Sequence, residues 1–299
     1  MKILVTGAGG FVGKRLTWKL AHGGHQVFAL VRAEPGAQDK RYFEGGNVTL
    51  VRADLATLDC AALPGGIEAV FTLGQSSYFR DFPTRAEEIY AVNVTANLKI
   101  LQWARQGGVR RVIHASSGGV YGGMKDVQFK ETDLLAVDSP LGFYLGTKLC
   151  SEIVLQNYRQ FFDTVAILRP FFIYGPGQRG DMFVARIIES VRSGAAVTLQ
   201  GQDGLRINPI YVDDAVDAFA ASLEVPGCSV FNVAGPDVVS LRALADLISK
   251  RVGRAPVFKI DAAAQPVDYV GTTAQAGRVL GAARIGLAQG LDLTINPRS

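Results

Sequence analysis

The chain has 299 residues, a formal net charge of +4, and only three cysteines and three histidines. Its length suits one large α/β domain, alone or with a smaller lobe. The spacing of Cys60, Cys150 and Cys228 excludes a disulfide framework, and the scattered histidines exclude a metal site. No basic cluster is interleaved with aromatic residues, which argues against nucleic acid as a partner and favours a small anionic ligand. Because the sequence contains neither a signal peptide nor a bilayer-length apolar run, we expect no membrane association and a cytoplasmic location.

The N-terminal segment, residues 2–13, has the order strand, tight turn, helix. An apolar run typical of a buried parallel strand is followed by Gly7, Gly10 and Gly13 and then by a helical pattern of leucines. Such a turn directs backbone N–H groups at a ligand, and glycine lets a pyrophosphate approach closely. Three glycines in a loop are often only a turn, but their position at the start of a βαβ unit predicts a dinucleotide site.

The second predicted strand, residues 25–32, ends where a dinucleotide fold meets the adenosine ribose. An acidic residue there would accept from a 2′-hydroxyl group, whereas an arginine favours a 2′-phosphate. Because the chain has Val31 followed by Arg32, we predict NADP as the cofactor, with NAD as the alternative. A solvated arginine at a strand end is the competing interpretation of Arg32.

Two further strands end in polar or small residues. The strand at residues 48–51 leads to Asp54, which we expect to accept from the adenine amino group, to cap a helix, or both. The strand at residues 69–73 runs from Leu73 into Gly74 and a small-residue turn that we place under the cofactor.

A long helical pattern covers residues 84–106, and Asn93 interrupts it. Asparagine has a low helix propensity, so Asn93 is either exposed or holds a buried backbone group or water. We favour the second interpretation.

The fifth strand, residues 111–115, leads to Ser117 at the edge of the sheet where a doubly wound fold places its chemistry. A later helix beginning at Pro140 carries Tyr144 and Lys148 four residues apart, so the two side chains share one face. A lysine ammonium near a phenol is expected to lower the phenol pKa. Ser117 would then bind the substrate oxygen, Tyr144 would transfer the proton, and a nicotinamide would transfer the hydride.

These segments together carry a family resemblance. The resemblance lies in residues 6–13, Asp54-Leu55, Asn93-Val94, Ser116-Ser117 with Val120-Tyr121-Gly122, Tyr144 with Lys148, and Arg169-Pro170 with Tyr174-Gly175-Pro176. The sequence resembles the extended short-chain dehydrogenase/reductases, and within them it is most similar to the NAD(P)-dependent sugar epimerase/dehydratase branch.

The resemblance implies an α/β fold with a Rossmann-type doubly wound parallel sheet and a smaller C-terminal substrate lobe. We therefore predict a dinucleotide-binding domain at residues 1–168, with return segments from about 207–234, and a substrate lobe mainly at residues 169–299. It also implies a homodimer through the paired helices 84–106 and 140–162.

The residue patterns above and the resemblance together assign roles to individual residues. The catalytic group is Ser117, Tyr144 and Lys148. The predicted cofactor-binding residues are Gly7, Gly10, Phe11, Val12, Gly13, Arg32, Asp54, Leu55, Leu73, Gly74, Asn93, Tyr144, Lys148 and Phe171. The predicted substrate-binding residues are Ser117, Tyr121, Tyr144, Phe172 and Arg206.

Three departures from the family pattern narrow the reaction. The acidic pair with which the 4,6-dehydratases eliminate water is replaced by Gly118 and Gly119, so dehydration is not expected. Phe172 stands where the family often has an asparagine that contacts the sugar nucleotide. The family's pyrophosphate-binding arginine aligns with Ile207, although Arg206 is adjacent.

Three functions remain open from the sequence. The first is a nucleotide-sugar epimerase or 4-ketoreductase with Tyr144 as its acid–base. The second is an NADPH-dependent reductase of a non-nucleotide ketone or aldehyde, which the residues at positions 32, 172 and 207 would suit. The third is a catalytically silent regulatory protein that binds NADP(H); the complete catalytic group argues against it.

Overall fold

The computed structural model describes residues 1–136 and 141–296. The chain divides into two compact units. The first unit comprises Met1–Val120, Leu135–Arg169 and Val216–Phe231; the second comprises Tyr121–Leu134, Pro170–Ala215 and Asn232–Ser299.

A seven-stranded sheet organises the first unit, in the order β10-β7-β5-β4-β1-β2-β3. All neighbouring pairs from β7 to β3 are parallel. The strands are β1 (Lys2–Thr6), β2 (Gln26–Val31), β3 (Val48–Arg52), β4 (Ala69–Thr72), β5 (Arg111–Ala115), β7 (Thr164–Pro170) and β10 (Gly227–Val233). The order reverses direction between β1 and β4, and this reversal defines a doubly wound Rossmann-type sheet. The predicted fold class is therefore confirmed.

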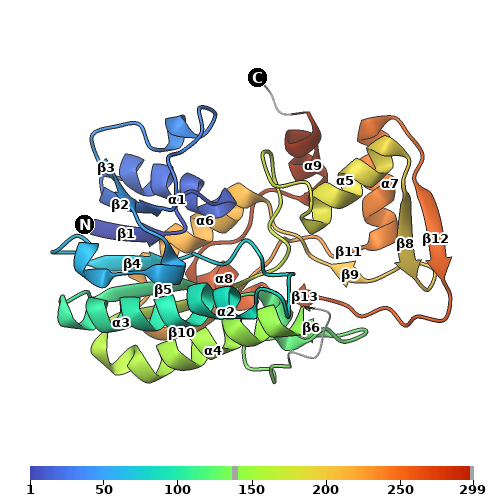
Figure 1. The fold of residues 1–299 in the computed structure, drawn as a ribbon. Coiled ribbons are helices and arrows are strands. Elements are labelled where there is room, and N and C mark those ends of the chain that lie inside the picture. The colour runs from blue at the N-terminus through green and yellow to red at the C-terminus, as the bar shows by residue number, and fades with distance from the viewer. Residues whose placement is uncertain (137–140, 297–299) are drawn as a thin grey trace. The chain divides into compact units, whose positions relative to one another are not determined.

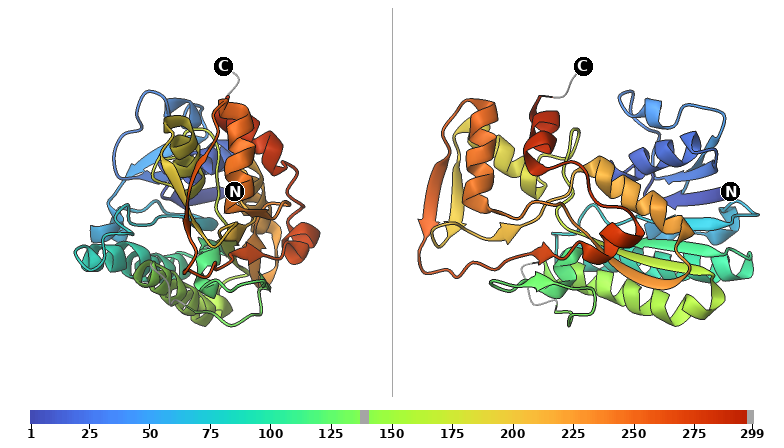
Figure 2. Two further views of the ribbon diagram at one scale, coloured as in Figure 1. Left: turned by 90° about the vertical axis from the view of Figure 1, so that its right-hand side faces the viewer. Right: turned by 180° about the vertical axis from the view of Figure 1, so that it is seen from behind.

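Helices on both faces explain why the central strands are apolar throughout. Ile3, Leu4 and Val5 of β1 are fully buried, as a strand covered on both sides requires. Figures 1 and 2 show α1 (Phe11–His22) and α6 (Val212–Ala221) on one face and α3 (Ala96–Gln106) and α4 (Gly142–Tyr158) on the other. The predicted start of α4 at Pro140 lies outside the described residues.

The helix predicted at residues 84–106 is not a single α-helix. It consists of α2 (Ala86–Tyr90), one π-helical turn at Ala91–Thr95, and then α3. The widened turn frees the carbonyl oxygen of Asn93, which accepts from Ser151 Oγ at 2.6 Å and from Asn97 Nδ2 at 2.5 Å. The side chains that bind this carbonyl oxygen therefore account for the break in the α-helical hydrogen bonding. π-Helical turns of this kind are frequent at functional sites.

The second unit contains three two-stranded sheets and four helices in its described part. The strands are β6 (Gln128–Phe129), β8 (Ala196–Gln200), β9 (Arg206–Ile207), β11 (Val239–Ser240), β12 (Val257–Asp261) and β13 (Val270–Gly271), and the helices are α5 (Phe183–Ser193), α7 (Leu241–Val252), α8 (Ala274–Val279) and α9 (Leu287–Ile295). The sheets pair β8 with β12, β9 with β11, and β6 with β13. Most of these strands escaped sequence analysis because two residues carry no periodicity.

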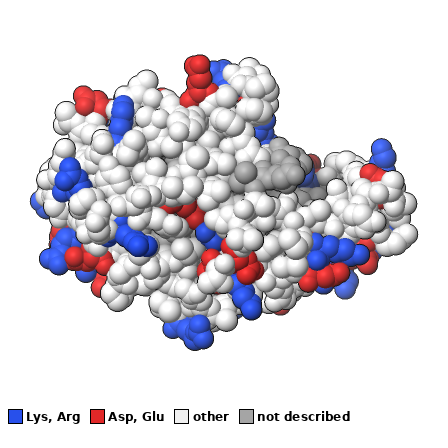
Figure 3. All heavy atoms as spheres, turned by 90° about the horizontal axis from the view of Figure 1, so that it is seen from below, with Lys and Arg blue, Asp and Glu red and all other residues white. Residues whose placement is uncertain are grey.

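On the face in Figure 3, Lys and Arg lie beside Asp and Glu rather than in a patch of one sign. Among residues 1–136 and 141–296, no helix is long and apolar enough to cross a membrane.

Candidate cofactor and catalytic site

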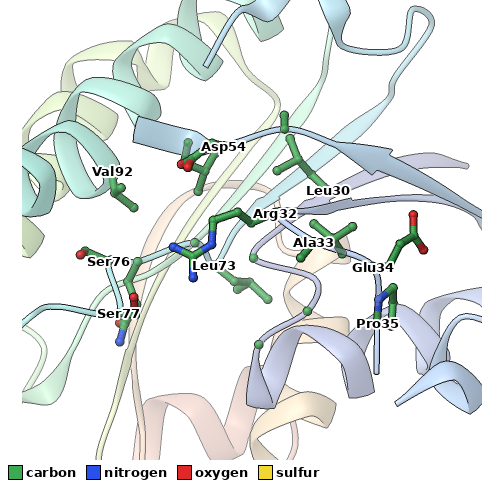
Figure 4. A pocket seen from close by; sticks show the side chains of 18 of the residues that line it. Leu30, Arg32, Ala33, Glu34, Pro35, Asp54, Leu73, Ser76, Ser77 and Val92 are labelled. Carbon is green, nitrogen blue, oxygen red and sulfur yellow. The ribbon is translucent and has the colours of Figure 1, made fainter. Parts of the chain in front are cut away.

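A pocket of about 480 Å³ opens at the carboxyl ends of the first strands of the first unit (Figure 4). Its lining includes seven of the predicted cofactor-binding residues: Gly7, Gly10, Arg32, Asp54, Leu55, Leu73 and Gly74. The ligand site of a doubly wound sheet lies outside this edge, next to the switch in strand order.

The glycines of the turn after β1 have two roles: two of them allow close packing, and one leaves the backbone open. A Cβ on Gly13 would lie 2.9 Å from the Cα of Ala8, and one on Gly7, whose φ is +66°, would lie 2.8 Å from the backbone of Gly74. These two glycines therefore allow the turn to pack against its own helix and against the end of β4. A Cβ on Gly9 would meet only Val31, at 3.7 Å, so the backbone there is open toward the pocket.

The first turn of α1 fits the pyrophosphate of a dinucleotide. Its N-cap, Gly10, has no side chain to satisfy the first N–H groups, and the first turn carries no acidic residue. Unsatisfied N–H groups at the positive end of a 12-residue helix form an anion site. Phe11 and Val12 contribute backbone here, and their role as cofactor contacts stays a prediction.

Arginine and carboxylates both surround the adenosine side of the pocket. Arg32 extends from the end of β2 toward the side where Ser76 and Ser77 lie, whereas Glu34 lies on the opposite side (Figure 4). Asp39 also lines the pocket, but its carboxylate accepts from Lys14 Nζ at 2.6 Å. Sequence analysis missed both acids, since they lie in the irregular segment after β2.

Polar side chains fix the segments beneath the pocket. Asp54 accepts from the N–H of Ala56 at 2.9 Å, so it caps a short 3₁₀ helix while lining the pocket. Asn93 accepts from the N–H of Ser76 at 2.9 Å and donates to Thr147 Oγ1 at 2.9 Å. The prediction that Asn93 holds a buried backbone group is confirmed, and it joins the turn after β4 to α4.

The three predicted catalytic residues converge in the first unit. Tyr144 is hydrogen-bonded to Ser117, and its hydroxyl donates to Gln75 Oε1 at 3.0 Å. Ser117 Oγ also accepts from the N–H of Gly119 at 3.2 Å. Lys148 Nζ lies 5.8 Å from the centre of the Tyr144 ring and donates to the carbonyl of Ala115 at 2.8 Å. Because Gln75 lines the pocket, the tyrosine hydroxyl lies beside it.

The expected lowering of the tyrosine pKa by Lys148 is wrong. Burial raises the pKa of Tyr144 well above 10, and the hydrogen bond from Ser117 and the charge of Arg80 only partly oppose this. Burial also lowers the pKa of Lys148 to about 8, against the opposing charge of Glu152. The Lys148 ammonium donates to the Ala115 carbonyl, and it is not among the groups that shift the pKa of Tyr144.

His114 is a packed residue of β5. Its imidazole is fully buried, and Nδ1 lies 2.8 Å from Thr72 Oγ1. Burial and the charge of Lys148 hold its pKa well below the usual value, so the ring is neutral.

The loop after β4 contributes residues that sequence analysis missed. The Phe79 ring lies 5.2 Å from that of Tyr144, and Arg80 stacks on Phe79 at 4.5 Å. Phe82 stacks on Phe143 at 4.5 Å, which secures the loop to the start of α4. No short motif marks these residues, because only the fold brings the loop to the tyrosine.

The remaining predicted substrate contacts lie in the second unit. Phe172 has a positive φ of 45° and packs against Phe183 and Tyr269 at 5.0 and 6.1 Å. Tyr121 is buried, and its hydroxyl donates to Asn232 Oδ1 at 2.8 Å.

Arg206 is held by two carboxylates of the second unit. It donates to Asp268 at 2.7 Å and to Asp126 at 2.8 Å. Burial would raise the pKa of Asp268, but Arg206 and two backbone N–H groups outweigh it and hold the pKa below its usual value.

Phe171, predicted to contact the cofactor, is also buried in the second unit. Its N–H donates to the carbonyl of Val233 at 2.9 Å, and its ring stacks on Tyr121 at 6.2 Å. The roles of Phe171, Phe172, Tyr121 and Arg206 toward ligands stay predictions.

Within the part of the chain that the structure describes, no group of three or more histidine, cysteine or acidic residues is arranged to hold a metal ion. All three cysteines are free thiols.

Known proteins resemble the chain over most of its length. It is 31% identical over 265 residues to the UDP-glucose 4-epimerase of Mycolicibacterium smegmatis (strain ATCC 700084 / mc(2)155), covering 85% of this chain and 83% of the relative. It is 28% identical over 287 residues to a dTDP-4-dehydro-6-deoxy-D-allose reductase of Streptomyces sp, covering 87% and 83%. The solved structure of MoeE5 in complex with UDP-glucuronic acid and NAD matches with a TM-score of 0.85 and 31% identity, covering 99% of this chain and 98% of that one.

The sequence model of one family covers the sheet, the pocket and the catalytic residues. This model describes the NAD dependent epimerase/dehydratase family and matches residues 3–234. With the fold and the assembled serine, tyrosine and lysine, the match establishes that the chain belongs to the NAD dependent epimerase/dehydratase family, as an NAD-dependent enzyme of the extended short-chain dehydrogenase/reductase type.

Proposed function

We propose that the chain is a nucleotide-sugar epimerase or 4-ketoreductase that transfers hydride at one sugar carbon. The observation that carries this proposal is the convergence of Ser117, Tyr144 and Lys148 at the end of β5 and on α4, with the tyrosine hydroxyl beside the cofactor pocket. A bound nicotinamide would supply the hydride acceptor and donor at this site.

The protein side chains would move one proton. Tyr144 Oη would take the proton of the reacting sugar hydroxyl, or give one to the corresponding carbonyl oxygen. Ser117 Oγ, held by the N–H of Gly119, would hydrogen-bond the same sugar oxygen. Lys148, protonated at neutral pH, would hydrogen-bond the cofactor ribose and place a positive charge near the phenol.

NADP is proposed as a cofactor in addition to the NAD used by the family. Arg32 lies exposed in the pocket, where its guanidinium can pair with a 2′-phosphate. Asp39, which would repel that phosphate, is already neutralised by Lys14. Glu34 remains as an acceptor for the ribose hydroxyls of NAD.

The substrate proposal draws on the relatives. The names of the epimerase and reductase relatives specify UDP and dTDP sugars, and MoeE5 was solved with UDP-glucuronic acid. Residues 169–299 are proposed to supply the substrate lobe.

A homodimer through the helices of the first unit is proposed as well. Leu98 on α3 and Ile153 on α4 leave 36% and 52% of their surface exposed, as a helix-pairing interface requires. A cytoplasmic location stays a prediction.

Two observations favour a second candidate, an NADPH-dependent reductase of a non-nucleotide ketone or aldehyde. Phe172 lies in an aromatic cluster with Phe183 and Tyr269, and Arg206 is engaged by Asp268 and Asp126. Phe172 has no polar group for a sugar diphosphate, and the Arg206 guanidinium, which is 42% exposed, is already paired with two carboxylates.

Calorimetric titration of the purified protein with NAD⁺, NADPH and UDP, dTDP and GDP sugars tests these alternatives. Binding of one sugar nucleotide together with a cofactor, followed by its conversion in NMR spectra, supports the first proposal. An epimerase returns its hydride and needs no added reductant, whereas a ketoreductase consumes NAD(P)H stoichiometrically. Binding of NADPH with no sugar nucleotide would overturn the first proposal and favour the second candidate.

A further inference from the structure

A buried ion pair lies directly behind the catalytic residues. Glu152 and Arg169 leave 0% and 3% of their side chains exposed, and the guanidinium holds the carboxylate through two bonds, Nε–Oε1 at 3.0 Å and Nη2–Oε2 at 2.6 Å. Ser116 Oγ donates a short hydrogen bond to the same Oε1 atom. Burying such a pair costs desolvation, and apolar side chains of similar size often stabilise a core as well or better.

This cluster joins the three elements that meet at the catalytic centre. Ser116 immediately precedes Ser117 after β5, Glu152 lies one turn beyond Lys148 on α4, and Arg169 is in β7. Lys148 Nζ donates to the carbonyl of Ala115, which precedes Ser116. One carboxylate is therefore linked to the segment that carries Ser117 and to the helix that carries Tyr144 and Lys148.

Glu152 also acts on the charge of Lys148. The ammonium faces Tyr144 and Glu152 on its own helix and His114 on β5, and Arg169 reaches it only through Glu152. His114 is neutral, so Glu152 is the one described acidic group that supports the charge of Lys148. Burial alone would lower the pKa of Lys148 further than about 8.

We propose that Glu152 is a positioning residue of the catalytic centre: together with Arg169 it holds Ser117 and Lys148 in their arrangement beside Tyr144. The inference rests on the proposed function, since it assigns Glu152 a part in the same reaction. Glu152 itself touches neither substrate nor cofactor.

The test compares Glu152→Gln and Ser116→Ala with Glu189→Gln, which makes the same change in an exposed pair with Arg192 on α5. Glu152→Gln is expected to lower kcat about tenfold with little change in KM, because the reacting groups are displaced while the binding surface remains. As the pH is raised, the activity and NAD⁺ affinity of this variant should decline at a lower pH than those of the wild type, because the pKa of Lys148 is lower without the Glu152 charge. Ser116→Ala should lower kcat about threefold without moving the pH profile, because the ion pair remains.

The double variant Glu152→Gln/Arg169→Gln keeps the test decisive if Glu152→Gln does not fold, since it leaves no buried charge unpaired. It is expected to retain the loss of kcat. Wild-type kcat and an unmoved pH profile in a folded Glu152 variant would overturn the proposal.

NAD⁺ affinity, measured by calorimetry at about pH 6.5 and about pH 8.5, separates this inference from the proposed function. If the wild type converts no sugar nucleotide, the proposed function fails. In that case the positioning role stands only if raising the pH from about 6.5 to about 8.5 weakens NAD⁺ binding more in Glu152→Gln than in Glu189→Gln. It fails if the rise in pH weakens NAD⁺ binding equally in the two variants.

Discussion

Tyr144 is surrounded by groups that hold its hydroxyl at one point. Gln75 accepts from it, Ser117 is hydrogen-bonded to it, and the Phe79 ring covers it. Burial raises the pKa of the phenol against the opposing hydrogen bond from Ser117, so the hydroxyl keeps its proton at neutral pH. A buried phenol with a fixed hydroxyl is a suitable proton donor to a single sugar carbonyl oxygen, and it can accept a proton only after it has lost its own.

Replacing Tyr144 by phenylalanine removes only that hydroxyl. We expect Tyr144→Phe to lower kcat by about 10²- to 10⁴-fold, with NAD⁺ affinity nearly unchanged, because general acid–base catalysis is lost while the pocket remains. Steady-state kinetics and calorimetry measure the two effects. Tyr158→Phe, on the same helix and packed edge-on against Phe161, is the control and should behave as the wild type. An unchanged kcat in Tyr144→Phe would refute the assigned mechanism.

Lys148 is a buried cation whose charge lowers the stability of the fold. Its pKa of about 8 lies below the ordinary value of 10.5. Between these pH values the unfolded chain binds a proton that the folded chain has released, so the free energy of unfolding rises with pH. Below pH 8 the full cost of the buried charge is present.

We therefore expect Lys148→Met to raise the free energy of unfolding at neutral pH by about 1–3 kcal/mol while abolishing turnover. Glu152 keeps its partner Arg169 in this variant, so no new unpaired charge is buried. Urea unfolding as a function of pH should show the gain shrinking above pH 8. Lys250→Met, an exposed position on α7, should leave stability within about 0.5 kcal/mol. A destabilised Lys148→Met would contradict the argument.

Arg32 is the residue whose charge can distinguish the two cofactors. Arg32→Ala should weaken NADPH binding by about tenfold or more, with little effect on NADH, because a charge-assisted contact to a phosphate is lost. Fluorescence titration with both cofactors measures the difference. Arg105→Ala, at the end of α3, serves as the control. Equal losses for NADH and NADPH would show that Arg32 does not contact a 2′-phosphate.

At the scale of elements, the turn between β1 and α1 leaves no room for an added Cβ at Gly13. Gly13→Ala would place a methyl group 2.9 Å from the Cα of Ala8, forcing α1 away from its strand. We expect a loss of about 2–3 kcal/mol in stability and a much weaker affinity for NAD⁺, because the helix N-terminus moves.

Gly146 provides the matched control for this substitution. It lies within α4, and a Cβ there would meet nothing within 4 Å. Gly146→Ala should therefore stabilise the chain by about 0.5–1 kcal/mol through helix propensity. Thermal unfolding of both variants, with and without NAD⁺, makes the comparison, and a Gly13→Ala variant as stable as the wild type would disprove the packing argument.

At the scale of the whole molecule, the exposed apolar side chains of α3 and α4 predict self-association. Ile153→Asp should convert the proposed dimer into monomers, because a charge buried at a helix interface without a partner is costly. Light scattering after gel filtration measures the mass. Ile260→Asp on β12, where the isoleucine is 44% exposed, should leave the mass unchanged. A wild-type monomer at micromolar concentration would refute the dimer.

Much of the first unit could be predicted from the sequence alone. β5 has the predicted bounds, and β2, β3 and β4 differ from the prediction by one or two residues. Strands and helices can be recognised from continuous apolar runs and from helical spacing, because both patterns lie within one short segment and depend only on which of its faces is buried. Ser117, Tyr144 and Lys148 could be found for the same reason: their positions follow from strand ends and from a four-residue helical spacing.

Only the tertiary structure decided how these residues act on one another. It placed Gln75 against Tyr144, Glu152 behind Lys148, and Asp39 on Lys14. It also reversed the expected pKa of Tyr144, since burial depends on every element around the ring and no local pattern reports it. The sequence by itself determined the sheet, the glycine turn and the candidate catalytic residues, because those follow from local periodicity and spacing. Charge pairing and desolvation depend on contacts between distant segments, so only the folded chain determines the electrostatics of the site.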